Sequence, residues 1–202
     1  MNRKIVLCLL SVMASVLFSI DIRAQEKGGD DKSRSMQEAQ KLGMPGDEHK
    51  KLAQLAGTWQ MEAKFFLSPG SNPLIAHGGA ENRMILGGRF LKSEVKGSGP
   101  LSFEGLNIIG FDRRYSKYTM VEYDTEGTYY VTADGQFDPA SNSILLSGEA
   151  DGPTAGVTEK YNTNIRIPGP DTYIVEIVFK NPEMTGGAKE FKAVEMTFTR
   201  AK

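Results

Sequence analysis

The chain has 202 residues, of which 40% are apolar, so it is long enough to bury one sizeable hydrophobic core. Its formal net charge is −1, and the sequence has no basic patch with interleaved aromatic residues. These two features exclude a general attraction to nucleic acid. The one cysteine, Cys8, lies close to the N-terminus, so the rest of the chain has neither a disulfide nor a thiol nucleophile.

The N-terminus is typical of a secretory signal peptide. Basic residues precede an apolar run from Ile5 to Ile20, and the small residue Ala24 marks the expected cleavage site. The run is shorter than the ~20 residues of a spanning helix, so we expect no membrane span after cleavage. Cleavage would remove three basic residues and one acidic residue, which changes the net charge to −3. The sequence predicts a signal peptide at 1–24 and a periplasmic or secreted protein; the alternative is an uncleaved N-terminal anchor.

Residues 25–46 form a predicted linker. The stretch from Gln25 to Ser35 is rich in charged residues, glycine and serine and has no apolar residue, which predicts a disordered tether. One or two helical turns are expected over Met36–Leu42, before the glycines and proline that follow. The folded domain is therefore predicted at 47–202.

A short amphipathic helix is predicted from Asp47 to the glycine at position 57. Acidic residues suit its positive N-terminal end, and Leu52 and Leu55 lie on one helical face. Gly57 tolerates the backbone angles that end a helix. From Trp59 onward, apolar and polar residues alternate, as in a half-buried strand. Trp59, the one tryptophan, is therefore expected to point into the core.

The rest of the domain alternates short apolar runs with glycine, proline, asparagine and aspartate. Gly87-Gly88 suits a two-residue hairpin, and 138–142 and 168–171 combine proline with other turn formers. Short connections favour antiparallel neighbours. The predicted strands are 57–67, 80–86, 89–96, 103–112, 117–124, 128–134, 143–150, 156–168, 171–180 and 189–200.

An open sheet of this size would leave two long unpaired edges, and closure removes them. The predicted fold is therefore all-β: a single antiparallel up-and-down barrel of about ten strands with a short N-terminal helix. A barrel of that strand number is wider than its side chains readily fill, which favours an internal cavity.

Several motifs of the predicted domain occur together in one order. They are His49-Lys50-Lys51-Leu52, Leu55-Ala56-Gly57-Thr58-Trp59, Leu86-Gly87-Gly88-Arg89-Phe90-Leu91, Phe103-Glu104-Gly105, Gly110-Phe111-Asp112, Tyr123-Asp124, the expected turn Gly135-Gln136-Phe137-Asp138, and Glu195-Met196-Thr197-Phe198-Thr199-Arg200.

This combination resembles the bacterial family called domain of unknown function 1579, from about Asp47 to the C-terminus. That family is similar to calycin-type barrels, the group of lipocalins, fatty-acid-binding proteins and nitrobindins. The resemblance implies a calycin-like barrel and a ligand-binding habit, but no established activity or site residues. In calycin barrels a GxW tryptophan meets an arginine of the last strand; the matching pair is Trp59 and Arg200, with Arg89 as the alternative partner. Such a contact is worth roughly 0.5–2 kcal/mol, and we expect it to close one barrel end.

The candidate ligand is a small apolar or amphipathic molecule in the barrel interior, since pockets are mostly apolar with a few placed polar groups. Both faces of the fifth and ninth strands carry apolar residues, so parity does not decide which face is inside. Glu122 or Glu176 on an inner face would need a partner such as Arg166 or Arg89; the alternative places both glutamates in solvent. The candidate ligand-binding residues are Trp59, Met61, Phe65, Met84, Arg89, Met120 and Glu122.

No catalytic, metal or cofactor site is expected. The sequence has no GxSxG elbow, HExxH pair or P-loop. Haem would need an axial ligand, but His49 and His77 lie in the predicted helix and a glycine-rich loop. The acidic residues between 124 and 138 match no defined calcium loop. The alternative to a carrier is a structural or protein-interaction module with a filled barrel, and an enzyme is the third possibility.

Overall fold

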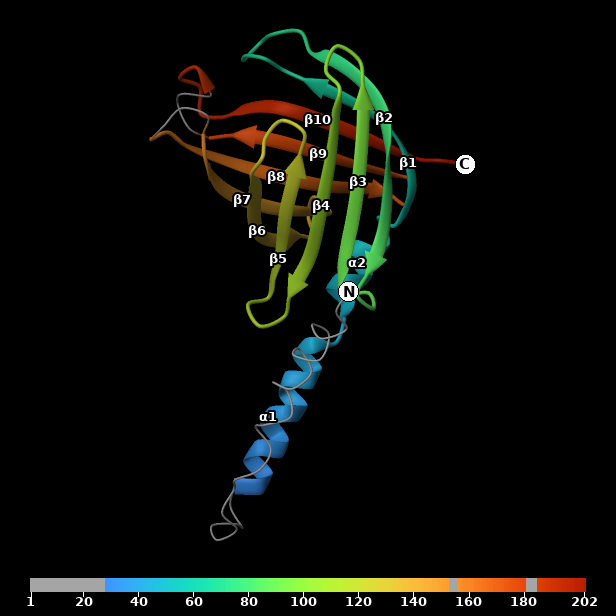
Figure 1. Cartoon of the computed structure of the whole chain (residues 1–202), viewed down its shortest axis with the longest axis vertical. Coiled ribbons are helices and arrows are strands. Elements are labelled where there is room, and N and C mark those ends of the chain that lie inside the picture. Colours follow the sequence, from blue (N-terminus) through green and yellow to red (C-terminus); the bar gives the residue numbers. More distant parts are fainter. Residues whose placement is uncertain (1–27, 153–155, 181–184) are drawn as a thin grey trace, which may run out of the picture. The chain divides into compact units, whose positions relative to one another are not determined.

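The computed structural model describes residues 28–152, 156–180 and 185–202 (Figure 1). The predicted signal peptide at 1–24 lies outside the described residues, as do residues 25–27 of the predicted linker. The chain divides into two units, with the boundary between Lys41 and Leu42.

The helix α1 (Gly28–Gly43) occupies most of the predicted linker. A disordered tether was expected up to Ser35, with helical turns only from Met36; the helix is longer than that prediction. The strong helix formers, residues 37–41, lie within the segment that was expected to be helical. The helix extends from there toward Gly28 because each residue added to an existing helix gains a hydrogen bond without a new nucleation step. Its side chains from Lys32 to Leu42 are all exposed.

Ten strands form one closed sheet in which every neighbouring pair is antiparallel and follows chain order, with β1 and β10 completing the circle (Figure 1). This confirms the predicted all-β up-and-down barrel. A short helix, α2 (Asp47–Ala53), precedes the first strand. The strands are β1 (Gly57–Phe65), β2 (Leu74–Ile85), β3 (Phe90–Ser98), β4 (Phe103–Asp112), β5 (Lys117–Asp124), β6 (Tyr130–Asp138), β7 (Ser143–Asp151), β8 (Thr158–Gly169), β9 (Thr172–Phe179) and β10 (Phe191–Arg200).

The first and last strands close the barrel in a defined register. Trp59 is opposite Arg200, and Phe65 is opposite Val194. The side chains of β1 alternate between buried and exposed from Thr58 to Ala63, with Trp59 and Met61 inside. The period-two pattern of the sequence therefore assigned the inner face of β1 correctly.

The second strand begins at Leu74, not at position 80 as predicted, because two glycines that suggested a loop belong to the sheet. Gly78 lies where the backbone of β3 comes so close that an added Cβ would overlap the Lys96 carbonyl. Gly79 has a similarly close contact with the Trp59 carbonyl of β1. These glycines permit close strand approach within the barrel wall.

The sixth strand differs from its prediction for the same reason. The residues Gly135–Asp138 were expected to form a turn, but β6 continues through them to Asp138. A Cβ on Gly135 would overlap the Leu145 carbonyl of β7. The β6–β7 turn follows, and there the Asp138 carboxylate accepts a hydrogen bond from the Ala140 amide at 3.0 Å.

The β2–β3 connection contains four residues rather than the predicted two. Ile85 and Phe90 are the last paired residues, and the residues between them include Leu86, Gly87 and Gly88, all with positive φ. The two glycines supply two of these left-handed conformations at low cost, and Leu86 (φ 49°) adopts a third.

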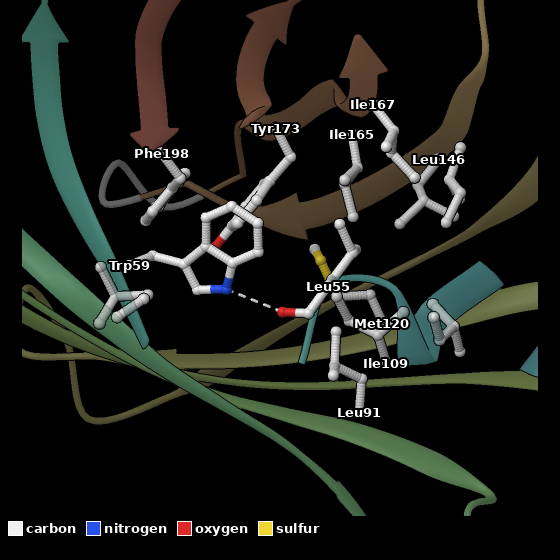
Figure 2. Close-up of a cluster of buried hydrophobic side chains, with 14 of the residues drawn as sticks. Leu55, Trp59, Leu91, Ile109, Met120, Leu146, Ile165, Ile167, Tyr173 and Phe198 are labelled. Atoms are coloured by element: carbon white, nitrogen blue, oxygen red, sulfur yellow. Dashed lines mark hydrogen bonds between the residues drawn. The ribbon is translucent and has the colours of Figure 1, made fainter. Parts of the chain in front are cut away.

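The helix α2 lies at the barrel end where β1 starts (Figure 1). Leu52 and Leu55 are buried in the core. The Leu55 carbonyl also accepts a hydrogen bond from the Trp59 indole N–H at 2.9 Å (Figure 2). The same carbonyl accepts a second hydrogen bond from the Asn82 amide, also at 2.9 Å. The segment that follows α2 is thereby attached to two strands, and this end of the barrel is closed.

Candidate functional site

Stacked aromatic rings fill the interior next to the closed end. The Tyr173 and Phe198 rings stack with their centroids 4.3 Å apart, and the Trp59 indole meets Tyr173 edge-on at 4.7 Å (Figure 2). The Tyr173 hydroxyl accepts a hydrogen bond from the Asn82 amide at 3.1 Å. The Tyr173 and Phe198 rings form the floor of the space beyond them, and the Trp59 indole packs against Tyr173 from outside that space.

Arg200 covers Trp59, as expected for the pair proposed to close the barrel. Its guanidinium lies 4.1 Å from the indole centroid and donates to the carbonyls of Gln54, Ala56 and Pro170. The alternative partner, Arg89, instead lies in the β2–β3 connection and donates to backbone carbonyls there and at Gly43.

Beyond the aromatic floor the interior contains a cavity with two adjoining parts. The inner part measures about 50 Å³ and the outer part about 350 Å³. They share the lining residues Val95, Asn107, Glu122, Ile177 and Met196, so they adjoin.

The walls of the cavity are mainly apolar. Besides the shared residues, the inner part is lined by Leu55, Asn82, Leu91, Ser93, Ile109, Met120, Thr163, Ile165, Tyr173, Val175 and Phe198. The outer part is lined in addition by Phe65, Leu101, Phe103, Gly105, Asp124, Glu126, Phe179 and Val194.

Glu122 is the charged residue common to both parts. It lies on the face of β5 that also carries the buried Tyr118 and Met120. Within the described part of the chain, its carboxyl has no hydrogen bond and no ion pair. Burial, and then the negative charge of Asp124, raise the pKa of Glu122 to about 7. A fraction of this carboxyl is therefore neutral near neutral pH.

The two glutamates considered from the sequence lie in different surroundings. Glu122 faces the interior, where a carboxylate without a partner is energetically unfavourable. Glu176 instead receives a hydrogen bond from Lys192 at 3.2 Å. Neither expected partner reaches Glu122, since Arg166 is exposed and Arg89 is held in its turn. The carboxyl therefore lacks the countercharge that a buried acid usually has.

Two further polar atoms of the inner part lack partners. The Asn82 side-chain oxygen and the Thr163 hydroxyl are buried without a hydrogen bond among the described residues. Ser93, also buried, and Asn107, half-buried, line the same space. Leaving such a group unsatisfied costs about 1–3 kcal/mol, so these atoms are available for a guest molecule or water.

The candidate ligand-binding residues fall into two groups. Met120 and Glu122 line the inner part and Phe65 lines the outer part. Trp59 and Met61 are buried core residues and Met84 is half-buried, but none of the three lines either part, and neither does Arg89.

Sequence reasoning missed several residues that line the cavity. Asn82 follows Ala80 at a spacing of two on β2, which was a usable signal once the strand's inner face was known. Thr163 had the same signal, because it lies between Tyr161 and Ile165 at a spacing of two on β8. Asn107 had no such signal, because β4 carries apolar residues on both faces. The residues missed include Asn82, Ser93, Val95, Asn107, Thr163 and Ile177.

Neither histidine of the described chain, His49 or His77, is placed to bind a metal or haem in the cavity. His49 accepts a hydrogen bond from the Gly46 amide at 3.0 Å at the start of α2, and burial lowers its pKa. His77 is exposed on β2, and neither residue lines the cavity. Over the described ranges no group of three or more potential metal ligands comes together. Among those same residues, no helix has the length and apolar character needed to cross a membrane.

Comparison with known proteins gives one family. Residues 44–200 match the family described as Protein of unknown function (DUF1579). A search of curated proteins finds no match.

Proposed function

The chain belongs to the DUF1579 family, and we propose that it binds a small amphipathic molecule inside its barrel. The supporting observation is the cavity, whose walls are mainly apolar but carry the unpartnered polar groups of Glu122, Asn82 and Thr163. Apolar walls with a few placed polar groups are the usual composition of a ligand pocket.

The size of the cavity limits the guest. Its two parts lie at the lower end of the roughly 300–1,000 Å³ range of small-molecule pockets. The rings of Trp59, Tyr173 and Phe198 occupy part of the interior at the closed end, which reduces the space left for a guest. A compact molecule fits this space better than a long lipid.

A guest would enter at the end opposite α2 and place its polar group inward. Glu122 lines both parts, so it lies where the outer space meets the inner one. Burial of the guest's apolar surface contributes about 25 cal/mol per Å², and hydrogen bonds to the unpartnered groups determine its orientation.

Mass spectrometry of small molecules that co-purify with the protein tests this proposal. Ile177 lines both parts of the cavity, whereas Ile174 on the same strand has the opposite parity and does not line it. We expect a bound species in the wild type and in Ile174→Trp, and its loss in Ile177→Trp. Equal recovery from both variants, or no exchangeable small molecule in any preparation, would contradict binding in the cavity.

An exposed apolar rim favours a second candidate, a protein-interaction module. Leu67, Leu101, Tyr129 and Tyr130 are exposed in or beside connections at the end opposite α2. A photo-cross-linking residue at position 129 would then give a discrete protein adduct in cells, and the same residue at Leu145, on β7, would not. Identical adduct patterns would argue against a specific partner.

The binding protein is proposed to act after export. The support is the sequence pattern of a cleaved signal at 1–24, which predicts a mature chain that starts at Gln25. Cell fractionation and intact-mass measurement test it: the expected product is periplasmic or secreted and lacks the first 24 residues. A full-length cytoplasmic product would overturn the export proposal without affecting the cavity.

A further inference from the structure

The lining of the cavity has one sign of charge. Glu122, Asp124 and Glu126 line its outer part at alternate positions, and no lysine, arginine or histidine is among the described residues that line either part. The apolar walls around the half-buried Glu122 reduce the screening of its charge by solvent, whereas Asp124 and Glu126 are exposed. An anionic guest such as a fatty acid would therefore be repelled, whereas a cationic one would be attracted.

Glu122 is the group that a cation would contact. It lies deepest of the three, since it alone also lines the inner part. It has no ion pair or hydrogen bond with any residue that the structure describes. Its titratable neighbours are Asp124 on β5 and Tyr161 on β8; burial, and then the charge of Glu122, raise the pKa of Tyr161 to about 12. Neither neighbour supplies a positive charge.

The remaining unpartnered atoms are hydrogen-bond acceptors. The Asn82 amide already donates to Leu55 and Tyr173, which leaves its side-chain oxygen free. The Thr163 hydroxyl can accept as well as donate. An ammonium group carries donors and no acceptor, so it matches a carboxylate beside such oxygens. A carboxylate or phosphate head group carries only acceptors, so among these groups it could pair only with the Thr163 hydroxyl.

We propose that the guest of the barrel is a compact apolar amine whose ammonium group pairs with Glu122. The inference rests on the proposed binding function and specifies its ligand class. The alkyl or aryl part of the amine lies against the apolar walls, among them Val95, Ile177 and Met196.

Three probes of equal chain length separate the proposal from simple apolar binding: octylamine, 1-octanol and octanoate, titrated calorimetrically into the purified mature protein at pH 8. We expect octylamine to bind at least about tenfold more tightly than either of the others. Glu122→Gln should reduce octylamine to the affinity of 1-octanol and leave 1-octanol unchanged. Glu149→Gln, which removes an exposed carboxylate of β7, should retain the preference.

The outcomes distinguish this inference from the proposed function. The amine proposal is contradicted if 1-octanol or octanoate binds as tightly as octylamine, or if Glu122→Gln still prefers octylamine. Either result leaves the proposed binding function intact. Absence of binding for all three probes overturns both. If Glu122→Gln does not fold, the wild-type protein provides the test. Its affinity for octylamine should decrease when the pH is lowered from 8 to 5, and its affinity for 1-octanol should stay the same.

Discussion

Arg200 lies over Trp59 with the two residues directly opposite each other in the β1–β10 register. The guanidinium also donates to the carbonyls of Ala56 at 3.0 Å and Pro170 at 2.9 Å, and it pairs with Asp171. One side chain therefore joins the last strand, the segment after α2 and the β8–β9 turn. The closed end of the barrel depends on this arrangement.

Removal of that side chain should destabilise the protein. We expect Arg200→Gln to lower the free energy of unfolding by about 2–4 kcal/mol, because several backbone acceptors and the indole lose their cationic partner. Urea denaturation followed by tryptophan fluorescence measures it. Arg166→Gln, on the exposed side of β8, is the matched control and should change stability by less than about 0.5 kcal/mol. Equal effects of the two substitutions would contradict a closing role for Arg200.

Close strand approach at Gly135 predicts a second stability effect. Gly135→Ala should destabilise the barrel by about 2–4 kcal/mol, since its Cβ would overlap the Leu145 carbonyl and the backbone has to move. Gly169→Ala is the control, because a Cβ there meets no atom within 4 Å. Thermal unfolding compares the two variants. A Gly135→Ala protein as stable as the control would show that the wall relaxes freely at this position.

The raised pKa of Glu122 predicts a dependence of stability on pH. Its pKa of about 7 lies above the ordinary value of 4.5, so the folded protein holds a proton that the unfolded chain has released between these values. The resulting stabilisation is complete below about pH 4.5 and is lost as the pH rises through 7. The free energy of unfolding of Glu122→Gln, minus that of the wild type, should therefore increase by on the order of 2–3 kcal/mol from pH 4.5 to pH 8. A difference that stays constant over this range in denaturant titrations would be inconsistent with a buried, unpaired carboxyl.

Binding of an amine should depend on the same titration. Only ionised Glu122 pairs with an ammonium, so octylamine affinity should be highest near pH 8 and fall below pH 7 toward the affinity of 1-octanol. The negative charge of Asp124 acts on Glu122, and Glu126 lines the same outer part; neither supplies a positive charge. Calorimetry at several pH values measures the profile, with 1-octanol as the uncharged control. A profile that rises toward low pH would point to a guest that accepts a hydrogen bond from the neutral acid.

The unpartnered hydroxyl of Thr163 makes opposite predictions for stability and for binding. Thr163→Val keeps the shape and removes a buried group without a hydrogen bond, so we expect the free protein to gain up to about 1 kcal/mol. Octylamine should bind roughly three- to tenfold more weakly if the hydroxyl contacts it. Thr132→Val, exposed on β6, should change neither quantity. Loss of stability in Thr163→Val would indicate a hydrogen bond to ordered water.

The fold was predictable because its signals are local, whereas the closing pair was expected from the family resemblance. Alternation from Trp59 onward requires neighbours only two positions away, and turn residues mark where each strand ends. The motifs around Gly57 and Arg200 indicated the family, which residues 44–200 confirm. The errors at Gly78, Gly79 and Gly135 have one cause: a glycine in a strand and a glycine in a turn look alike until a neighbouring backbone is in place.

The cavity was decided by tertiary structure. Parity does not choose an inner face where both faces of a strand are apolar, as on β5, so the position of Glu122 depended on how Tyr118 and Met120 pack against other strands. The free volume depends on side chains brought together from nearly every strand, which no local pattern encodes. By itself the sequence determined the barrel, because strands and turns follow from short-range periodicity and turn residues. The pairing of Trp59 with Arg200 was expected from the family resemblance. The charge in the cavity and the space beside it followed only from the packing of distant strands around one interior.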